Sequence, residues 1–151
     1  MADDGEKLRQ TDGLGFDVSR VHADHKFREL HVWQQAMDLV VEVYQLTEAF
    51  PRDERFTLTA QTRRTAISIP ANVAEGACRR ATPAFLNHVD IALGSEGELF
   101  TQLELGRRLG YVPPARVEHS LQMLSAVGRM LNGLATSLEQ RLAEDRPSTG
   151  R

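Results

Sequence analysis

The chain has 151 residues and a mass of 16.9 kDa, with 26% charged and 41% hydrophobic residues, which predicts one globular domain with short tails. No apolar run approaches the roughly 20 residues that a membrane span needs, so we expect no membrane-spanning segment and no membrane partner. The net charge of −3 argues against attraction to phosphate by the molecule as a whole, so any anion site has to be local.

Both ends of the chain lack apolar periodicity. Residues 1–26 are rich in Asp and Gly and hold six acidic and four basic residues, so this predicted flexible arm supplies −2 of the net charge of −3. Its start lacks the basic and apolar segments of a secretion signal, so we expect a cytoplasmic protein. A second flexible tail is predicted for residues 143–151, which leaves residues 27–142 as the folded domain.

Apolar residues spaced by three and four predict a first helix from about Phe27 to Phe50, with two neighbouring apolar seams. One seam consists of Leu30, Trp33, Met37, Val40 and Tyr44. The other consists of Val32, Ala36, Leu39, Val43, Leu46 and Phe50. Polar residues, Glu42 among them, occupy the remaining side, which we expect to face water. So wide an apolar face can serve two contacts, one with the core and one with another subunit.

The first helix is predicted to stop at Phe50-Pro51, because proline disfavours helical geometry in the residue before it. A second helix is predicted from near Asp53 or Glu54 to about Arg80. At about 100° per residue, its polar residues fall on one side of the helix. This polar stripe consists of Gln61, Arg64, Ser68, Asn72, Glu75 and Arg79. Small or branched apolar residues fill most other positions, so we expect the stripe to be partly buried and hydrogen-bonded.

Pro70 lies inside this second helix. It removes one backbone donor and clashes with the carbonyl of Ala66, at a cost of about 3 kcal/mol if nothing compensates. A kink is the predicted response. Two interpretations stay open: the kink fits the helix around a core, or it opens the polar stripe into a site for a ligand or partner.

Thr82-Pro83 has the signature of a helix start, and a third helix is predicted to run through Leu109. Its Gly94-Ser95-Glu96-Gly97 segment lacks the lysine of a phosphate loop, so close helix packing is the better interpretation. Pro113-Pro114 marks the break before the next helix, and apolar spacing predicts that this fourth helix runs to about Leu142. The fold class predicted is all-α, an antiparallel up-down-up-down four-helix bundle, because the helices are joined by links of a few residues.

Sixteen of the eighteen basic residues are arginines. Eight of them form four close pairs: Arg52 with Arg55, Arg63 with Arg64, Arg79 with Arg80, and Arg107 with Arg108. Arginine grips phosphate or carboxylate in a two-pronged fork, so each pair could form an anion site. Solvated helix faces are the alternative interpretation.

Neither a metal nor a cofactor is predicted. A di-metal site in a helical bundle needs Glu-x-x-His pairs on two helices, and the sequence has none. His88 is interpreted as a structural group, and Cys78, the single cysteine, can form neither an internal disulfide nor a nucleophile pair with a nearby histidine. Trp33, Tyr44 and Tyr111 are not interleaved with basic residues, as a stacking platform for single strands would require.

The sequence resembles the small bacterial four helix bundle protein family in two stretches, FPRDERFTLTAQTRRTAISIPANVAEGACRR and FLNHVDIALGSEGEL. Members of that family include proteins encoded in intervening sequences of 23S rRNA genes, and accessory proteins of diversity-generating retroelements are related. The resemblance covers about Phe27 to Leu138. Its most specific part is the SIPAN-x-AEG core, from Ser68 to Gly76.

This resemblance implies a bundle that assembles into a homopentamer and has no known catalytic activity, so we do not expect an enzyme. In the retroelement branch the assembly carries basic surface and engages a reverse transcriptase and nucleic acid. By that resemblance, Arg63, Arg64, Arg79 and Arg80 are candidates for such contacts. This chain differs from that branch because it is mildly acidic rather than strongly basic.

Three functional hypotheses result. The first is a non-catalytic scaffold that assembles with itself through the apolar face of the first helix and the small residues of the second. The second adds contact with nucleic acid or a nucleoprotein partner through the four candidate arginines. The third is a small-ligand binder or enzyme that uses Ser68, Asn72 and Glu75 of the polar stripe, with His88 from the third helix.

Overall fold

The structure is a computed structural model, and it describes residues 25–146. Four α-helices make up most of this range: α2 (His31–Thr47), α3 (Leu58–Cys78), α4 (Thr82–Arg108) and α5 (Pro114–Glu144). Two short 3-10 helices, η1 (Lys26–Glu29) and η2 (Arg52–Glu54), precede α2 and α3. The described range contains no strand, so the predicted all-α fold with four helices is confirmed. The predicted arm and tail lie mostly outside this range.

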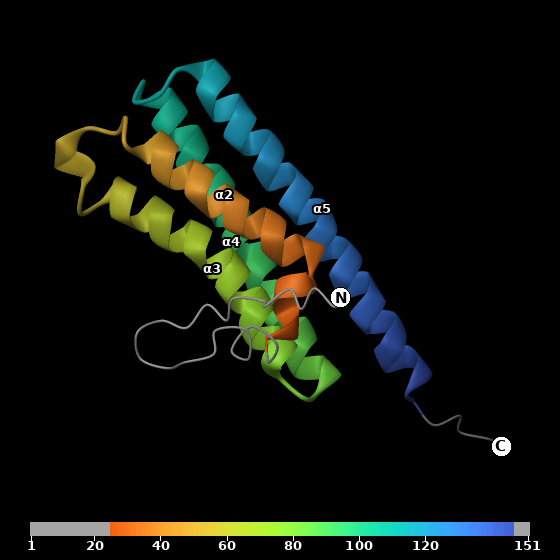
Figure 1. Ribbon diagram of the computed structural model, residues 1–151. Coiled ribbons are helices and arrows are strands. Elements are labelled where there is room, and N and C mark those ends of the chain that lie inside the picture. Colours follow the sequence, from red (N-terminus) through yellow and green to blue (C-terminus); the bar gives the residue numbers. More distant parts are fainter. Residues whose placement is uncertain (1–24, 147–151) are drawn as a thin grey trace, which may run out of the picture.

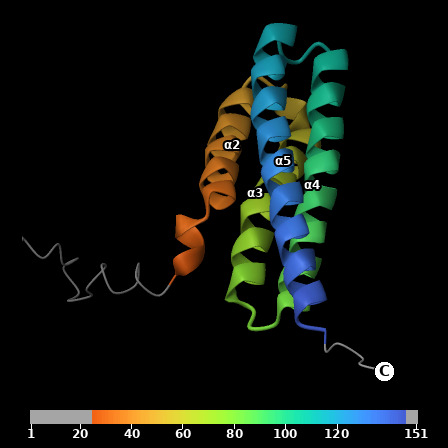
Figure 2. The same ribbon diagram turned by 90° about the vertical axis from the view of Figure 1, so that its right-hand side faces the viewer.

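Each helix packs against its neighbours in the sequence, and α5 returns to pack against α2 (Figure 1). The α2–α3 and α4–α5 links lie at one end of the bundle and the α3–α4 link at the other (Figure 1). Helices α2 and α4 therefore lie on opposite sides, as the view in Figure 2 shows. Helices α3 and α4 have the most extensive contact in the bundle, and the polar stripe of α3 lies beside this contact.

The α2–α3 link differs from the prediction. Helix α2 ends at Thr47 rather than Phe50, and η2 is separated from α3, which begins at Leu58. The carboxylate of Glu54 accepts hydrogen bonds from the backbone N–H of Leu58 (3.1 Å) and from the hydroxyl of Thr57. Glu54 therefore satisfies a free N–H group at the start of α3, and the helix begins after it rather than at it.

The two apolar seams of α2 have different surroundings. Buried residues make up the seam of Val32, Ala36, Leu39, Val43, Leu46 and Phe50, which joins one core cluster with buried residues of the other three long helices. In the other seam, Leu30, Trp33 and Val40 are half-buried, whereas Met37 and Tyr44 are each 40% exposed. The bundle thus covers one seam of its first long helix and leaves part of the other open.

Glu42 contradicts the prediction that it faces water, because its side chain is buried at the contact between α2 and α5. Its carboxylate accepts hydrogen bonds from the guanidinium of Arg116, one at 3.1 Å, and from the hydroxyl of Ser120 at 2.6 Å. A buried carboxylate requires such partners. Since both partners come from a distant part of the sequence, no local pattern around Glu42 indicated them.

Helix α3 continues through Pro70 without interruption, and Pro70 is buried. The kink remains a prediction. The expectation of close packing at Gly94 and Gly97 is wrong: both are exposed, and no described atom of another helix lies within 4 Å of the place a Cβ would occupy. Close approach occurs instead at Gly106, where an added Cβ would lie 2.8 Å from Cζ of Phe50.

The variant Gly106→Ala is expected to destabilise the protein by about 1–3 kcal/mol, because the buried ring of Phe50 has to move. Gly133→Ala is the control, since Gly133 lies in α5 with open space around it and alanine favours helix by about 1 kcal/mol. Urea unfolding measures both variants. Equal stability of the two would contradict the packing described for Gly106.

Candidate functional site

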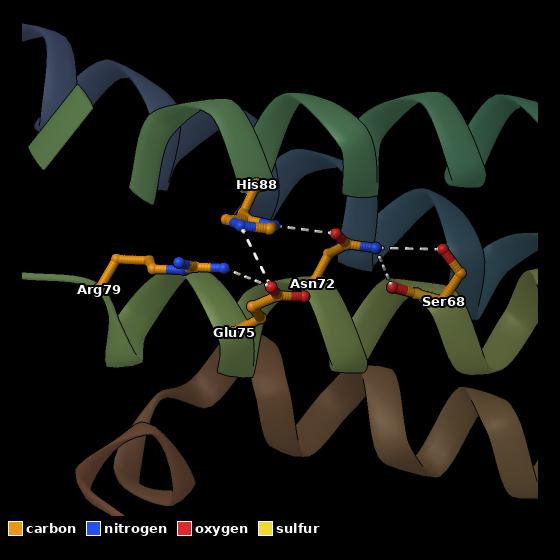
Figure 3. A network of polar contacts seen from close by, with 5 residues as sticks. All are labelled: Ser68, Asn72, Glu75, Arg79 and His88. Atoms are coloured by element: carbon orange, nitrogen blue, oxygen red, sulfur yellow. Dashed lines mark hydrogen bonds and ion pairs between the residues drawn. The ribbon is translucent and has the colours of Figure 1, made fainter. Parts of the chain in front are cut away.

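Part of the polar stripe of α3 forms a hydrogen-bonded network with α4 (Figure 3). The amide nitrogen of Asn72 donates to the backbone carbonyl of Ser68 at 2.9 Å and to the Ser68 hydroxyl at 3.2 Å. On the α4 side, the Ser68 hydroxyl lies 2.7 Å from that of Ser95, and Oδ1 of Asn72 lies 3.1 Å from Nδ1 of His88. Asn72 therefore connects two turns of α3 to α4.

Asn72 also determines which ring nitrogen of His88 carries a proton. The amide nitrogen of Asn72 already donates to Ser68, so its oxygen has to accept. We therefore assign the proton to Nδ1 of His88. The other nitrogen, Nε2, lies 3.7 Å from Oε1 of Glu75, where a proton would complete an ion pair.

Glu75 is the outer member of the network and pairs with Arg79 in the i,i+4 order within α3, at 2.7 Å. The hydrogen bond from Arg79 is the main reason that the pKa of Glu75 lies below its usual value, and the nearby His88 lowers it further. Both Glu75 and Arg79 are about half exposed, so their ion pair contributes little to stability.

Gly76 explains why the two helices come close enough for this network. A Cβ at Gly76 would lie 2.7 Å from Cδ2 of Phe85 and 2.8 Å from Cβ of His88, both on α4. Any larger residue would push α4 away. Within the SIPAN-x-AEG core, Gly76 thus sets the distance between the helices and Asn72 makes the polar contact across it.

The other two residues of the stripe, Gln61 and Arg64, stay outside the network. They line an open hollow of about 560 Å³ between α3 and α4. The hollow is also lined by Phe56, Thr57, Ala60, Thr65, Ser68, Ser95 and Glu98. Within residues 25–146, neither Arg64 nor Glu98 forms an ion pair. The stripe therefore divides into a structural part and an open part.

The four candidate arginines do not form one patch in a single copy. Arg64 and Arg79 are 15 residues apart in sequence, which corresponds to about 22 Å along α3. Arg79 is paired with Glu75. Arg63 donates to the hydroxyl of Thr47 (2.8 Å), and its guanidinium carbon lies 4.6 Å from the ring centroid of Tyr44. A combined site would require several copies.

Sequence reasoning missed Phe56, the most exposed of the large apolar side chains described, at 84%. It lies just before α3, and the guanidinium carbon of Arg55 is 5.3 Å from its ring centroid. Phe56 also borders two further hollows, of about 390 and 540 Å³. The available signal in the sequence was the Arg55-Phe56 pair, an aromatic residue directly beside a basic one.

No group of three or more His, Cys, Asp or Glu residues suited to hold a metal ion occurs in the described range. Cys78 is exposed at the end of α3. None of the described helices combines the length and apolar character needed to cross a membrane.

Over residues 28–133 the sequence matches the family described as 23S rRNA-intervening sequence protein. The chain belongs to this family. Its structure is similar to the crystal structure of a protein of unknown function from the S23 ribosomal protein family of Bacteroides thetaiotaomicron VPI-5482, with a TM-score of 0.65. At 23% identity, over 70% of this chain and 95% of that one, the similarity shows a shared fold. Among curated proteins, none matches the sequence.

The variant Asn72→Leu is expected to destabilise the protein by about 1–3 kcal/mol, because Ser68 and His88 lose their shared partner. Gln61→Leu is the control within the same stripe, since Gln61 is exposed, and a change within about 0.5 kcal/mol is expected there. Thermal and urea unfolding measure the difference. If both variants behave alike, the network does not hold α3 to α4.

Proposed function

We propose that this protein is a non-catalytic scaffold that assembles with copies of itself, as a homopentamer, through the outer faces of α2 and α3. The observation that carries the proposal is a row of exposed apolar side chains on α2. Met37 is 40% exposed, Val41 is 56% exposed and Tyr44 is 40% exposed. At steps of four and three these residues share one side of the helix. We call them the α2 row.

The apolar surface extends from the α2 row onto α3. Ile67 is 43% exposed, and it lines the same hollow of about 390 Å³ as Tyr44. Ala71 lies one turn beyond Ile67 and is also exposed. Adjoining apolar side chains of this kind mark interaction sites on soluble proteins.

The free energy gained by burying these apolar side chains is comparable with the cost of association. Fully burying one large apolar side chain contributes about 1.5–3 kcal/mol, so four that are already half covered would add about 4 kcal/mol per copy. An interface buries such a surface on each of two copies. The cost of association is about 4–15 kcal/mol, so one contact is marginal and a closed ring, in which each copy makes two contacts, is favoured.

The polar network supports a structural role rather than catalysis. Ser68, Asn72 and His88 all have hydrogen-bond partners within the protein. A nucleophile would need a base beside it and donors for a developing negative charge. The side chain nearest to the Ser68 hydroxyl is another serine hydroxyl, which is not a base.

Light scattering coupled to size-exclusion chromatography tests the proposed assembly. The expected mass is several times 16.9 kDa, and five times that value for the pentamer. Because apolar burial drives the contact, the mass should change little when the salt concentration is raised. A monodisperse monomer at concentrations on the order of tens of micromolar would contradict the proposal.

A second function, contact with single-stranded nucleic acid, is favoured by the exposed ring of Phe56. Arg52, Arg55 and Arg64 lie around the hollows that Phe56 borders, and none of them forms an ion pair with another described residue. An aromatic ring among cations is what stacking on bases requires. A ring of copies would repeat this group and concentrate charge that one chain lacks.

Fluorescence anisotropy with a labelled single-stranded RNA at low salt measures such binding. The triple variant Arg55→Ala, Phe56→Ala and Arg64→Ala is expected to bind at least tenfold more weakly. The double variant Arg79→Ala and Arg80→Ala, at the other end of α3, is the matched control and should bind normally. No binding by the wild-type protein, or equal loss in both variants, would reject this second function.

A further inference from the structure

Helix α4 has an exposed apolar row of its own. Ile91 is 45% exposed and Leu105 is 44% exposed, and both lie in α4. Glu98 lies midway between them, and steps of seven residues place all three on one side of the helix. We call these three residues the α4 row. Of the large apolar side chains exposed on α4, Phe100 is different, because it faces roughly the opposite side.

The α2 row and the α4 row belong to helices on opposite sides of the bundle (Figure 2). They cannot both lie in one contact between two copies related by a twofold axis unless that contact extends across α3. Tyr44 and Glu98 border two different hollows on the flanks of α3, which share Phe56, Ala60 and Arg64. Each row needs a cover. The described part of the chain supplies no such cover, since all of these apolar side chains remain 40–56% exposed.

Symmetry connects the two rows. A closed ring of more than two copies around one axis requires a head-to-tail contact, in which one face of each copy meets a different face of the next. The proposed function supplies one of these faces, the α2 row with the adjoining part of α3. The α4 row is a second exposed surface, on the other flank of α3, where the apolar side chains of Ile91 and Leu105 lie on either side of Glu98.

The charges of the two rows are complementary. Glu98 lies within the α4 row, is exposed, and has no ion-pair partner among residues 25–146. Arg63 lies beside the α2 row, with its guanidinium carbon 4.6 Å from the ring centroid of Tyr44, and its hydrogen bonds go to uncharged oxygen atoms. Among the residues that the structure describes, each row thus has, within it or beside it, one charge without an ion-pair partner, and the two charges are opposite in sign.

We propose that the α4 row of one copy binds the α2 row of the next, with Glu98 beside Arg63 of the neighbouring copy. This inference rests on the proposed self-assembly and names the two surfaces that meet. It makes the contact head-to-tail, so that each copy uses both rows once and the assembly can close into a ring.

Two variants that each disable one row test this directly. Val41→Arg places a charge on the α2 row and Leu105→Arg places one on the α4 row, both at exposed positions. Native mass spectrometry is expected to show each variant alone as a monomer. At a concentration well above that at which the wild type assembles, so that a single contact can form, an equimolar mixture is expected to contain a dimer of one copy of each variant and nothing larger, because one intact row remains on either variant. Phe100→Arg, at the other exposed side of α4, is the control and should assemble as the wild type does.

The outcomes separate this inference from the proposed function. A monomeric wild-type protein would reject self-assembly and the inference with it. If the wild type assembles and Leu105→Arg assembles equally well, self-assembly stands and the role of the α4 row is wrong. If both variants are monomers and their mixture stays monomeric, the two rows do not meet.

Circular dichroism measures the helix content of the arginine variants and so shows whether they fold. A milder substitution provides an independent test. Glu98→Arg changes an exposed, unpaired residue and is expected to weaken assembly at least tenfold, with an unchanged unfolding temperature for the dissociated protein. Glu98→Gln should weaken it less. Assembly of Glu98→Arg at wild-type strength would overturn the pairing with Arg63.

Discussion

The structure depends on one mismatch: α2 has more apolar surface than its own bundle can cover. Leu39 and Val43 are fully buried in the core, whereas Val41, between them in sequence, is 56% exposed. A helix inside a four-helix bundle needs one apolar stripe, and α2 has two. Exposure of the second stripe to water is unfavourable, and the proposed assembly would remove this cost by covering its side chains.

The polar network between α3 and α4 fixes the position of these two helices relative to each other. Gly76 allows the two helices to approach, and Asn72 hydrogen-bonds across the contact to His88. Buried polar contacts depend strongly on direction, so they define how α4 is set against α3 more sharply than apolar packing does. The orientation of α4 in turn determines where Ile91 and Leu105 lie relative to α2.

Much of the fold could be predicted from the sequence, because helix ends and apolar spacing are local signals. Helix α4 begins at Thr82-Pro83 and α5 begins at Pro114, as expected. Two of the failures have a common cause, since they depend on residues distant in the sequence. Glu42 is buried because Arg116 and Ser120 approach it from α5, and the glycines that lie close to another element are Gly76, Gly106 and Gly128 rather than Gly94. For the site, periodicity grouped the polar stripe correctly but could not show that only part of it reaches α4.

Whether the outer face of α2 is covered in solution can be measured with a single reporter. In a Cys78→Ser background, a cysteine introduced at Val41 reacts with a maleimide at a rate that depends on access. The account predicts that this rate falls as protein concentration rises, whereas a cysteine introduced at Ser125, exposed on α5, reacts at a constant rate. Fast labelling at position 41 that does not vary with concentration would contradict the account.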